Sequence, residues 1–387
     1  MTKRISVLFC AFLLTATLKA QVSGYLQTQY QYGEESASLK VGSPNENPDE
    51  SFNRIGIRRG RIKFIHEEKG ITGVVQVDFT EKGLGIKDAY FNIKRKEFDF
   101  VQLKAGIFDR PFGNEISYSS SRRESPERSL IFQTLFPDER DLGGMLVLQA
   151  PKTSPWSAFK LEAGLFSGNA ISMEADSKKD FISHLSFTKT FTKTITLGLG
   201  ISYYNGGVYQ GVENVYTMKG KEFVLNSDSS NRGQFAKREY LGCDVQFSVA
   251  NPFGKTQLRA EYLFGQQPGT SSSSKSPNTS VLPTVDTYIR DFSGGYAILV
   301  QDIGTSPFSA VLKYDWYDPN TQISENEVLA KADLFYNTLG MGALWRIQSN
   351  LILQAYYEIN RNEKTSSINA AEDIKDNVFT LRVQYKF

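Results

Sequence analysis

Apolar and polar residues alternate along nearly the whole chain after about residue 20. In the last segment Phe379, Leu381, Val383, Tyr385 and Phe387 share one face, and the polar residues between them share the other. A period of two is typical of a half-exposed β-strand, whereas helical periodicity is nearly absent. Apolar runs also fall short of the roughly 18–20 residues that a membrane helix needs. The pattern predicts an all-β protein and excludes a helical transporter.

Sixteen such segments can be marked. They are 22–32, 52–66, 71–79, 86–94, 100–108, 143–150, 157–166, 181–189, 195–205, 237–249, 255–265, 287–301, 307–316, 335–346, 351–361 and 377–387. Their connections alternate between tight turns and mostly long polar loops, the short stretch 80–85 being the exception. An even-stranded up-and-down barrel has this rhythm, with both termini at the turn end.

Two architectures could hold sixteen amphipathic strands. A soluble sandwich or propeller would bury the apolar face, whereas a membrane barrel turns it to lipid and lines a wet interior with the polar face. The polar face carries full charges such as Arg59, Asp78, Arg259 and Glu261, which a dry core would not tolerate unpaired. Segment lengths suit tilted membrane strands, and aromatic residues gather near segment ends as interfacial girdles do. We therefore expect a sixteen-stranded antiparallel transmembrane β-barrel with long outer loops.

The N-terminus reads as an export signal. Residues 1–20 begin with Lys3 and Arg4, continue with a short apolar stretch and end in Ala20, which predicts cleavage there and a barrel over 21–387. The alternative is a buried N-terminal helix. Losing Lys3, Arg4 and Lys19 from the 44 basic residues leaves 41 against 42 acidic ones. That balance lacks the basic excess of a nucleic-acid-binding protein.

The C-terminus carries a second localisation signal. Phe387 ends the chain directly after an alternating strand. This ending resembles the C-terminal strand signature of Gram-negative outer-membrane proteins, which their barrel-assembly machinery reads. The expected location is thus the outer membrane of a Gram-negative bacterium, with outer-membrane lipid as the surrounding partner.

The third long connection, 109–142, differs from the other loops. Ser125, Pro126 and Glu127 have the order of a helix start, with a capping hydroxyl, a proline and an acid. Five large apolar residues follow, which are Leu130, Ile131, Phe132, Leu135 and Phe136. We expect this loop to fold inward and narrow a channel that sixteen strands would otherwise leave open. The alternatives are packing over the barrel mouth or against a neighbouring subunit.

Several short motifs occur in a characteristic order. They are Arg58-Arg59-Gly60-Arg61, Lys87-Asp88-Ala89-Tyr90, the run from Lys104 to Gly113, Glu127-Arg128-Ser129, and Arg140-Asp141-Leu142-Gly143-Gly144. As a set, strongest over about 52–150, they resemble the phosphate-selective porin O and P family. The resemblance implies a homotrimeric sixteen-strand outer-membrane porin with an inward-folded third loop and a basic path for small anionic solutes.

Candidate pore-lining residues follow from strand phase and loop position. They are Arg59, Arg61, Lys63, Lys104 and Arg382 on strands, and Arg122, Arg123, Arg128 and Arg140 in the loop. Guanidinium groups offer phosphate paired donors in a planar fork. The loop 109–142, however, holds seven acids against five arginines. The alternative is that the arginines pair with acids and pin the loop to the wall.

Other functions find less support. Catalysis needs a nucleophile, a base and an orienting group, but the only two histidines, His66 and His184, define no such set. The His and Cys residues also lack the spacing of metal ligands, and no cofactor is expected. An outer-membrane barrel enzyme therefore stays the alternative to a passive porin. A surface adhesin or receptor is the third reading, based on the long loops 206–236 and 266–286, where Ser271–Ser274 and Lys275 predict a flexible exposed stretch. Cys243 falls on the apolar face and is expected to face lipid.

Overall fold

The computed structural model describes residues 20–95, 97, 99–368 and 370–387. The segment 1–19 of the predicted export signal lies outside these residues. The described chain has eighteen strands, which are β1 (Gln21–Gly33), β2 (Phe52–Glu68), β3 (Ile71–Thr80), β4 (Gly83–Lys94), β5 (Val101–Asp109), β6 (Arg140–Gln149), β7 (Phe159–Phe166), β8 (Asp180–Thr190), β9 (Ile195–Tyr209), β10 (Asn214–Lys219), β11 (Glu222–Ser227), β12 (Phe235–Asn251), β13 (Gly254–Gly269), β14 (Thr287–Asp302), β15 (Phe308–Asp318), β16 (Tyr336–Gln348), β17 (Leu351–Asn362) and β18 (Val378–Lys386). Over the same residues, the helices are too short to cross a bilayer.

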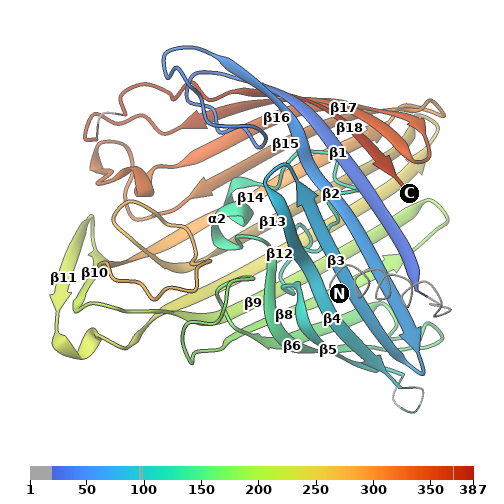
Figure 1. Cartoon of the computed structure of the whole chain (residues 1–387), viewed down its shortest axis with the longest axis horizontal. Coiled ribbons are helices and arrows are strands. Elements are labelled where there is room, and N and C mark those ends of the chain that lie inside the picture. Colours follow the sequence, from blue (N-terminus) through green and yellow to red (C-terminus); the bar gives the residue numbers. More distant parts are fainter. Residues whose placement is uncertain (1–19, 96, 98, 369) are drawn as a thin grey trace, which may run out of the picture.

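Sixteen of these strands close into one antiparallel barrel. Sequence neighbours pair around the ring, β9 pairs with β12, and β18 pairs with β1 to complete the circle. Each of the sixteen predicted segments overlaps one of these strands, so the predicted fold is confirmed. In Figure 1 the long loops lie at the left end of the barrel and the short turns at the right.

The two faces of each strand differ as the alternation predicts. On β1, Gln27, Gln29 and Gln31 are buried on the inner side, while Tyr30 and Tyr32 are exposed on the outer side. An inward glutamine finds partners inside the barrel: Gln27 Nε2 donates to Gln384 Oε1 at 2.7 Å. Apolar side chains that are exposed on the outer face therefore mark the surface that meets lipid.

A hairpin interrupts the predicted loop 206–236. β10 and β11 pair with each other, and Val215–Thr217 of β10 pairs in parallel with the start of β14. The rings of Tyr216 and Tyr288 stack across this contact with centroids 4.4 Å apart. Each strand has only six residues, which is too short for a period of two to stand out, so the alternation pattern did not reveal the hairpin.

The helix in the third loop begins later than predicted. Helix α2 spans Leu130–Leu135 with Ser129 at its N-cap, so the start predicted at Ser125 is wrong. The Ser125 hydroxyl donates to the Glu127 carbonyl at 2.9 Å, and the Pro126 carbonyl accepts from Arg382 at 3.0 Å. One of these contacts is local and the other reaches β18. Both use groups that a helical start would need, and they keep residues 125–129 out of the helix.

The loop 266–286 is not wholly the exposed stretch that was predicted. Ser271, Ser272, Ser273 and Lys275 are exposed, but Ser274 and Ser276 are buried. The Ser276 backbone N–H donates to the carbonyl of Thr134 in α2 at 3.0 Å. Carbonyls in the last turn of a helix lack hydrogen-bond donors within that helix. The loop 266–286 supplies such a donor to Thr134 of α2.

Candidate functional site

The loop from β5 to β6 packs on one wall of the barrel through aromatic side chains. Phe136 in this loop lies 4.9 Å from Phe112 and 5.7 Å from Tyr240 of β12, measured between ring centroids. Phe132 meets Tyr296 of β14 edge-on at 6.1 Å. All five side chains are almost fully buried. The apolar residues that stood out in the sequence therefore hold the loop against β12–β14, and Figure 1 shows α2 within the ring of strands.

A glycine permits this close approach. Gly113 has φ of +59°, and its N–H donates to Ser202 Oγ at 2.8 Å. A Cβ added there would fall 2.0 Å from Glu261 Oε2. Because other residues rarely adopt that φ and a Cβ would also displace the Glu261 carboxylate, glycine suits this position best.

The other side of the loop is held by a cluster of charges around Glu127. The Glu127 carboxylate accepts from Arg58 at 2.7 and 2.8 Å, from Arg59 at 2.7 Å and from Arg382 at 3.2 Å. Burial by itself would raise the pKa of Glu127, but Arg58, Arg59 and Arg382 hold that pKa well below its ordinary value. Glu127 therefore stays ionised, and one negative charge faces three positive ones.

A β-bulge brings the adjacent arginines to the same side. The register of β1 with β2 passes from Gln27 opposite Arg59 to Thr28 opposite Ile57, which leaves Arg58 as the extra residue. An extra residue breaks the alternation of facing, so Arg58 and Arg59 both reach Glu127. Strand phase alone would have placed Arg58 toward lipid.

A second β-bulge, in β4, has the same effect on two neighbouring charged residues. Gln76 lies opposite Asp88 and Val77 opposite Ile86, so Lys87 is the extra residue. Lys87 Nζ lies 2.9 Å from Glu139, and Asp88 accepts from Arg140 at 2.9 Å. Two successive charged residues thus reach the loop from one strand.

The sequence contained a signal for both bulges. Apolar residues of β2 change from odd positions, Ile55 and Ile57, to even positions, Ile62 and Phe64. In β4 they change from Leu84 and Ile86 to Ala89, Phe91 and Ile93. A switch of parity within a strand requires an extra residue between the two stretches, so Arg58 and Lys87 could have been found.

The nine predicted pore residues fall into two groups. Six pair with acids, namely Arg59 and Arg382 with Glu127, Arg61 with Asp78, Lys104 with Asp109, and Arg128 and Arg140 with Glu139. Within the described chain, the other three, Lys63, Arg122 and Arg123, form no ion pair. Pairing with acids therefore accounts for most of the predicted cations.

Arg123 differs from the other eight predicted pore residues because its side chain is both buried and without a hydrogen-bond acceptor in the described chain. Its side chain is buried, and Nε, Nη1 and Nη2 all lack a hydrogen-bond acceptor among the described residues. Burial, followed by the charges of Arg128 and Arg59, holds the pKa of Arg123 well below its ordinary value. Such a buried, unpaired charge is costly.

Arg123 also lines a cavity of about 260 Å³ on the side of the loop toward the short turns. Arg122, Arg346, Arg382 and Lys386 line the same cavity. A smaller cavity of about 160 Å³ lies on the long-loop side. Its charged lining consists of four acids and three basic residues, which are Glu127, Asp315, Glu358, Asp376, Lys40, Arg128 and Arg361. The loop therefore separates a cavity with five basic residues and one acid, Glu124, from a cavity in which acidic and basic residues nearly balance.

Asp376, in the loop before β18, should make the net charge of the second cavity depend on pH. Burial, followed by the charges of Asp373 and Glu34, raises the pKa of Asp376 to about 6. Lowering the pH from 7 to 5 should protonate most of this carboxyl and remove a negative charge, which favours anion entry. One charge about 8 Å away in water contributes about 0.5 kcal/mol, so we expect roughly a twofold rise in anion over cation permeability.

Reversal potentials at the two pH values test this. Asp376→Asn should lack the Asp376 component of the pH response, whereas Asp49→Asn, in the loop after β1, should retain it. An equal response in both variants would show that other groups produce it.

The two histidines lie on different strands, His66 on β2 and His184 on β8. His184 Nε2 lies 2.9 Å from Asp244 Oδ2 on the barrel wall, and His66 is exposed near the β2–β3 turn. Within the same part of the chain, groups of three or more His, Cys, Asp or Glu that could hold a metal ion are absent.

Comparison with known proteins agrees with this geometry. The model of the family described as phosphate-selective porin O and P matches residues 68–266, a little over half of the chain. No curated protein sequence matches. Among solved structures, Salmonella typhi OmpF in complex with daunomycin is 12% identical with a TM-score of 0.61, covering 95% of this chain and 97% of that one.

Two further structures share the fold. The outer membrane channel DcaP of Acinetobacter baumannii is 14% identical with a TM-score of 0.54, covering 95% of this chain and 97% of its own. OmpT of Vibrio cholerae in its trimer form is 11% identical with a TM-score of 0.54, covering 95% of this chain and 99% of its own. At these identities the likeness establishes the barrel fold.

Proposed function

The chain belongs to the phosphate-selective porin O and P family and is an outer-membrane porin, and from that premise we propose that it conducts small anions such as phosphate by passive diffusion. Passive selectivity needs a wet path and a local field of one sign. The loop between β5 and β6 would form the constriction of that path. No catalytic step is part of the proposal.

The observation that carries anion preference is the unpaired guanidinium of Arg123. Burial lowers the pKa of Arg123, but a guanidinium starts from so high an ordinary pKa that it keeps its proton in proteins. The cost of burying its charge is therefore relieved by an anion. Arg123 has three groups of N–H donors without acceptors and faces the cavity that Arg382 and Lys386 share. A phosphate or chloride ion in this cavity would supply the missing acceptors.

The charge cluster around Glu127 supports the same preference. One carboxylate against Arg58, Arg59 and Arg382 leaves two positive charges in excess where the loop meets the wall. Lys63, on the inward face of β2, adds a cation nearer the short turns. These charges would attract anions along the path on the turn side of the loop.

Planar-bilayer recordings of Arg123→Gln test the proposal. Reversal potentials in a salt gradient should indicate anion preference for the unaltered protein, and phosphate should reduce the chloride current. In Arg123→Gln the phosphate concentration for half-block should rise at least about tenfold, since a charge-assisted, forked donor is lost. Arg123→Lys should fall between the two because it keeps the charge without the fork.

Arg54→Gln is the matched control. Arg54 pairs with Glu46 in the loop after β1, away from the cavity, so its loss should leave the block unchanged. Cation preference of the unaltered protein, or equal block in Arg123→Gln and Arg54→Gln, would contradict the proposal.

We further propose that the porin assembles as a homotrimer after export and removal of residues 1–20. The V. cholerae OmpT structure was determined in a trimer form, which supports this assembly. At the C-terminus, the Phe387 N–H donates to the Gly24 carbonyl at 3.0 Å and the Gly24 N–H donates back at 2.9 Å. Phe387 therefore ends the strand that closes the barrel, the position at which the assembly machinery would read it.

A further inference from the structure

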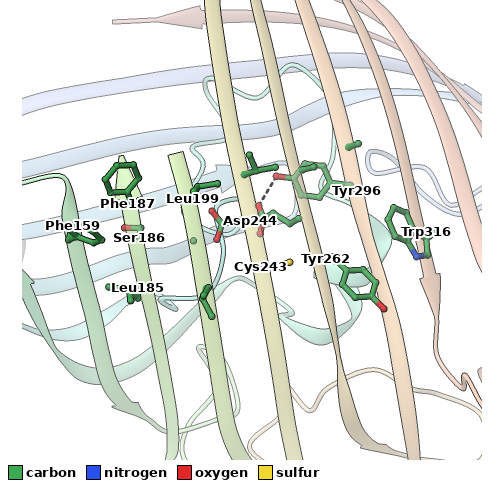
Figure 2. A pocket seen from close by; sticks show the side chains of 16 residues that line it. Phe159, Leu185, Ser186, Phe187, Leu199, Cys243, Asp244, Tyr262, Tyr296 and Trp316 are labelled. Carbon is green, nitrogen blue, oxygen red and sulfur yellow. Dashed lines mark hydrogen bonds between the residues drawn. The ribbon is translucent and has the colours of Figure 1, made fainter. Parts of the chain in front are cut away.

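A groove of about 640 Å³ crosses the outer face of the barrel wall. Figure 2 shows its side chains spread over neighbouring strands, from Phe159 and Phe187 at one end to Trp316 at the other, with Cys243 and Tyr262 between them. Cys243 is exposed, as the alternation predicts for the apolar face. The groove therefore opens toward the lipid and not toward the channel.

Small residues on neighbouring strands produce the hollow. Ala260 of β13 lies opposite Ala297 of β14, and Tyr262 lies opposite Cys243 on one side and Gly295 on the other. The lining is otherwise made mainly of large aromatic and aliphatic side chains. An apolar chain can therefore lie in this depression.

The groove lies in the half of the membrane nearer the short turns. Phe187, at its lower end, is three residues from the turn end of β8, and Cys243 is eight residues from the turn end of β12. For strands tilted by about 40°, the groove thus extends from about 8 Å to about 20 Å above the turns. A hydrocarbon core about 30 Å thick gives each leaflet's acyl chains about this depth. Short turns face the periplasm, and the periplasmic leaflet of an outer membrane consists of phospholipid.

Two turns lie side by side below the lower end of the groove. The turn 191–194 directly follows β8, and the Thr188 N–H near the end of β8 donates to the Ala158 carbonyl in the turn 151–158 at 2.8 Å. Exposed aromatic rings mark both turns as interfacial, with Trp156 in one and Phe191 in the other. We call residues 151–158 and 189–194 together the basic turn sector.

The basic turn sector carries positive charge without compensation. Lys152, Lys189 and Lys193 are exposed, and in the described chain none of the three forms an ion pair. Acidic residues are absent from 150–161 and from 186–199. Lys189 follows Phe187 on the same outward row of β8, and its Nζ lies 5.5 Å from the centroid of the Phe191 ring. A cation is thus held directly below the groove.

Other turns at this end of the barrel mix the two signs of charge. The segment 67–69 between β2 and β3 has two acids and one lysine, and 94–99 has three basic residues and two acids. Next to β14, Asp302 pairs with Arg346 at 3.3 Å. The uncompensated positive charge is therefore placed where the groove reaches the membrane surface.

We propose that the groove and the basic turn sector bind one anionic phospholipid of the periplasmic leaflet. An acyl chain lies in the groove, and the lipid phosphate meets the ammonium groups of Lys152, Lys189 and Lys193. A headgroup such as glycerol adds no positive charge, whereas the ammonium of an ethanolamine headgroup would be repelled by the three lysines. The inference rests on the barrel in its membrane and not on anion selectivity of the channel.

Native mass spectrometry of the purified full-length barrel tests the proposal. The protein is extracted in detergent and exchanged with dioleoyl-phosphatidylglycerol or with dioleoyl-phosphatidylethanolamine as the probe. We expect one phosphatidylglycerol retained per chain and about fivefold less phosphatidylethanolamine, since the two lipids differ by one charge near the lysines. Equal retention of the two lipids would overturn the proposal.

A lysine variant locates the headgroup. Lys152→Gln, Lys189→Gln and Lys193→Gln combined should lower retained phosphatidylglycerol to the level of phosphatidylethanolamine. The matched control removes three exposed, unpaired lysines of the described chain at the long-loop end, namely Lys219, Lys275 and Lys331, by the same change to glutamine. Equal loss in the two triple variants, or no loss in either, would overturn the assignment.

A groove variant locates the acyl chain. Ala260→Phe with Ala297→Phe fills the hollow and should lower the retention of phosphatidylglycerol about tenfold, because the chain loses its buried apolar contact. Ala343→Phe, on the exposed outer face of β16, should not. Heat-modified mobility on gels shows that each variant is folded, and single-channel recordings report conduction separately. Undiminished retention in the filled variant would overturn the proposal, and so would loss of an oligomer without loss of lipid, since the groove would then be a contact between copies.

Discussion

Replacing Glu127 with glutamine should raise the anion over cation permeability of the porin about fivefold. The substitution removes the single negative charge that faces Arg58, Arg59 and Arg382 and leaves the side-chain volume almost unchanged. A unit charge about 4 Å away contributes about 1 kcal/mol even in water, which corresponds to that factor. Reversal potentials across a potassium chloride gradient measure the change.

Glu46→Gln is the control for this prediction. Glu46 also pairs with an arginine, Arg54, but it lies in an exposed surface loop. It should shift selectivity little because solvent screens exposed charges beyond about 10 Å. A shift of equal size in both variants, or a move toward cations in Glu127→Gln, would contradict the assignment of this cluster to the conduction path.

Truncating Phe136 to alanine should release the loop from the barrel wall. Its ring packs against Phe112, Phe132, Tyr204 and Tyr240, and large-to-small changes at such sites cost about 3–5 kcal/mol. The strand ladder does not depend on this contact, so most of the loss should fall on loop docking. A loss of 3 kcal/mol raises the undocked fraction by more than about a hundredfold.

Single-channel recordings and limited proteolysis measure this loss. We expect larger conductance, more open-channel noise and cleavage within 110–139. Phe91→Ala removes an exposed outward ring from β4 and should leave all three unchanged. Resistance to protease and unaltered conductance in Phe136→Ala would mean that the charge clusters alone hold the loop.

Much of the candidate site was predictable because it depends on which face of a strand each side chain occupies. Arg59, Arg61, Lys104 and Arg382 could be placed on the inner wall by counting alternate residues. Arg58 and Lys87 were missed because strict counting puts them toward lipid, although the parity of their apolar neighbours shifts on either side. The helix start at Ser125 was wrong because local capping chemistry competed with Arg382, which lies more than 250 residues away in sequence.

The sequence by itself determined the sixteen strands of the barrel and the facing of most of their residues, since a period of two in side-chain polarity is a local property that each strand carries alone. Tertiary structure decided which charges cancel. Glu127 neutralises arginines from β2 and β18, while Arg123, four residues earlier, has no acceptor in the described chain. Coulomb interactions depend on distance in space, and the closure of a barrel brings residues from both ends of the chain to the same loop.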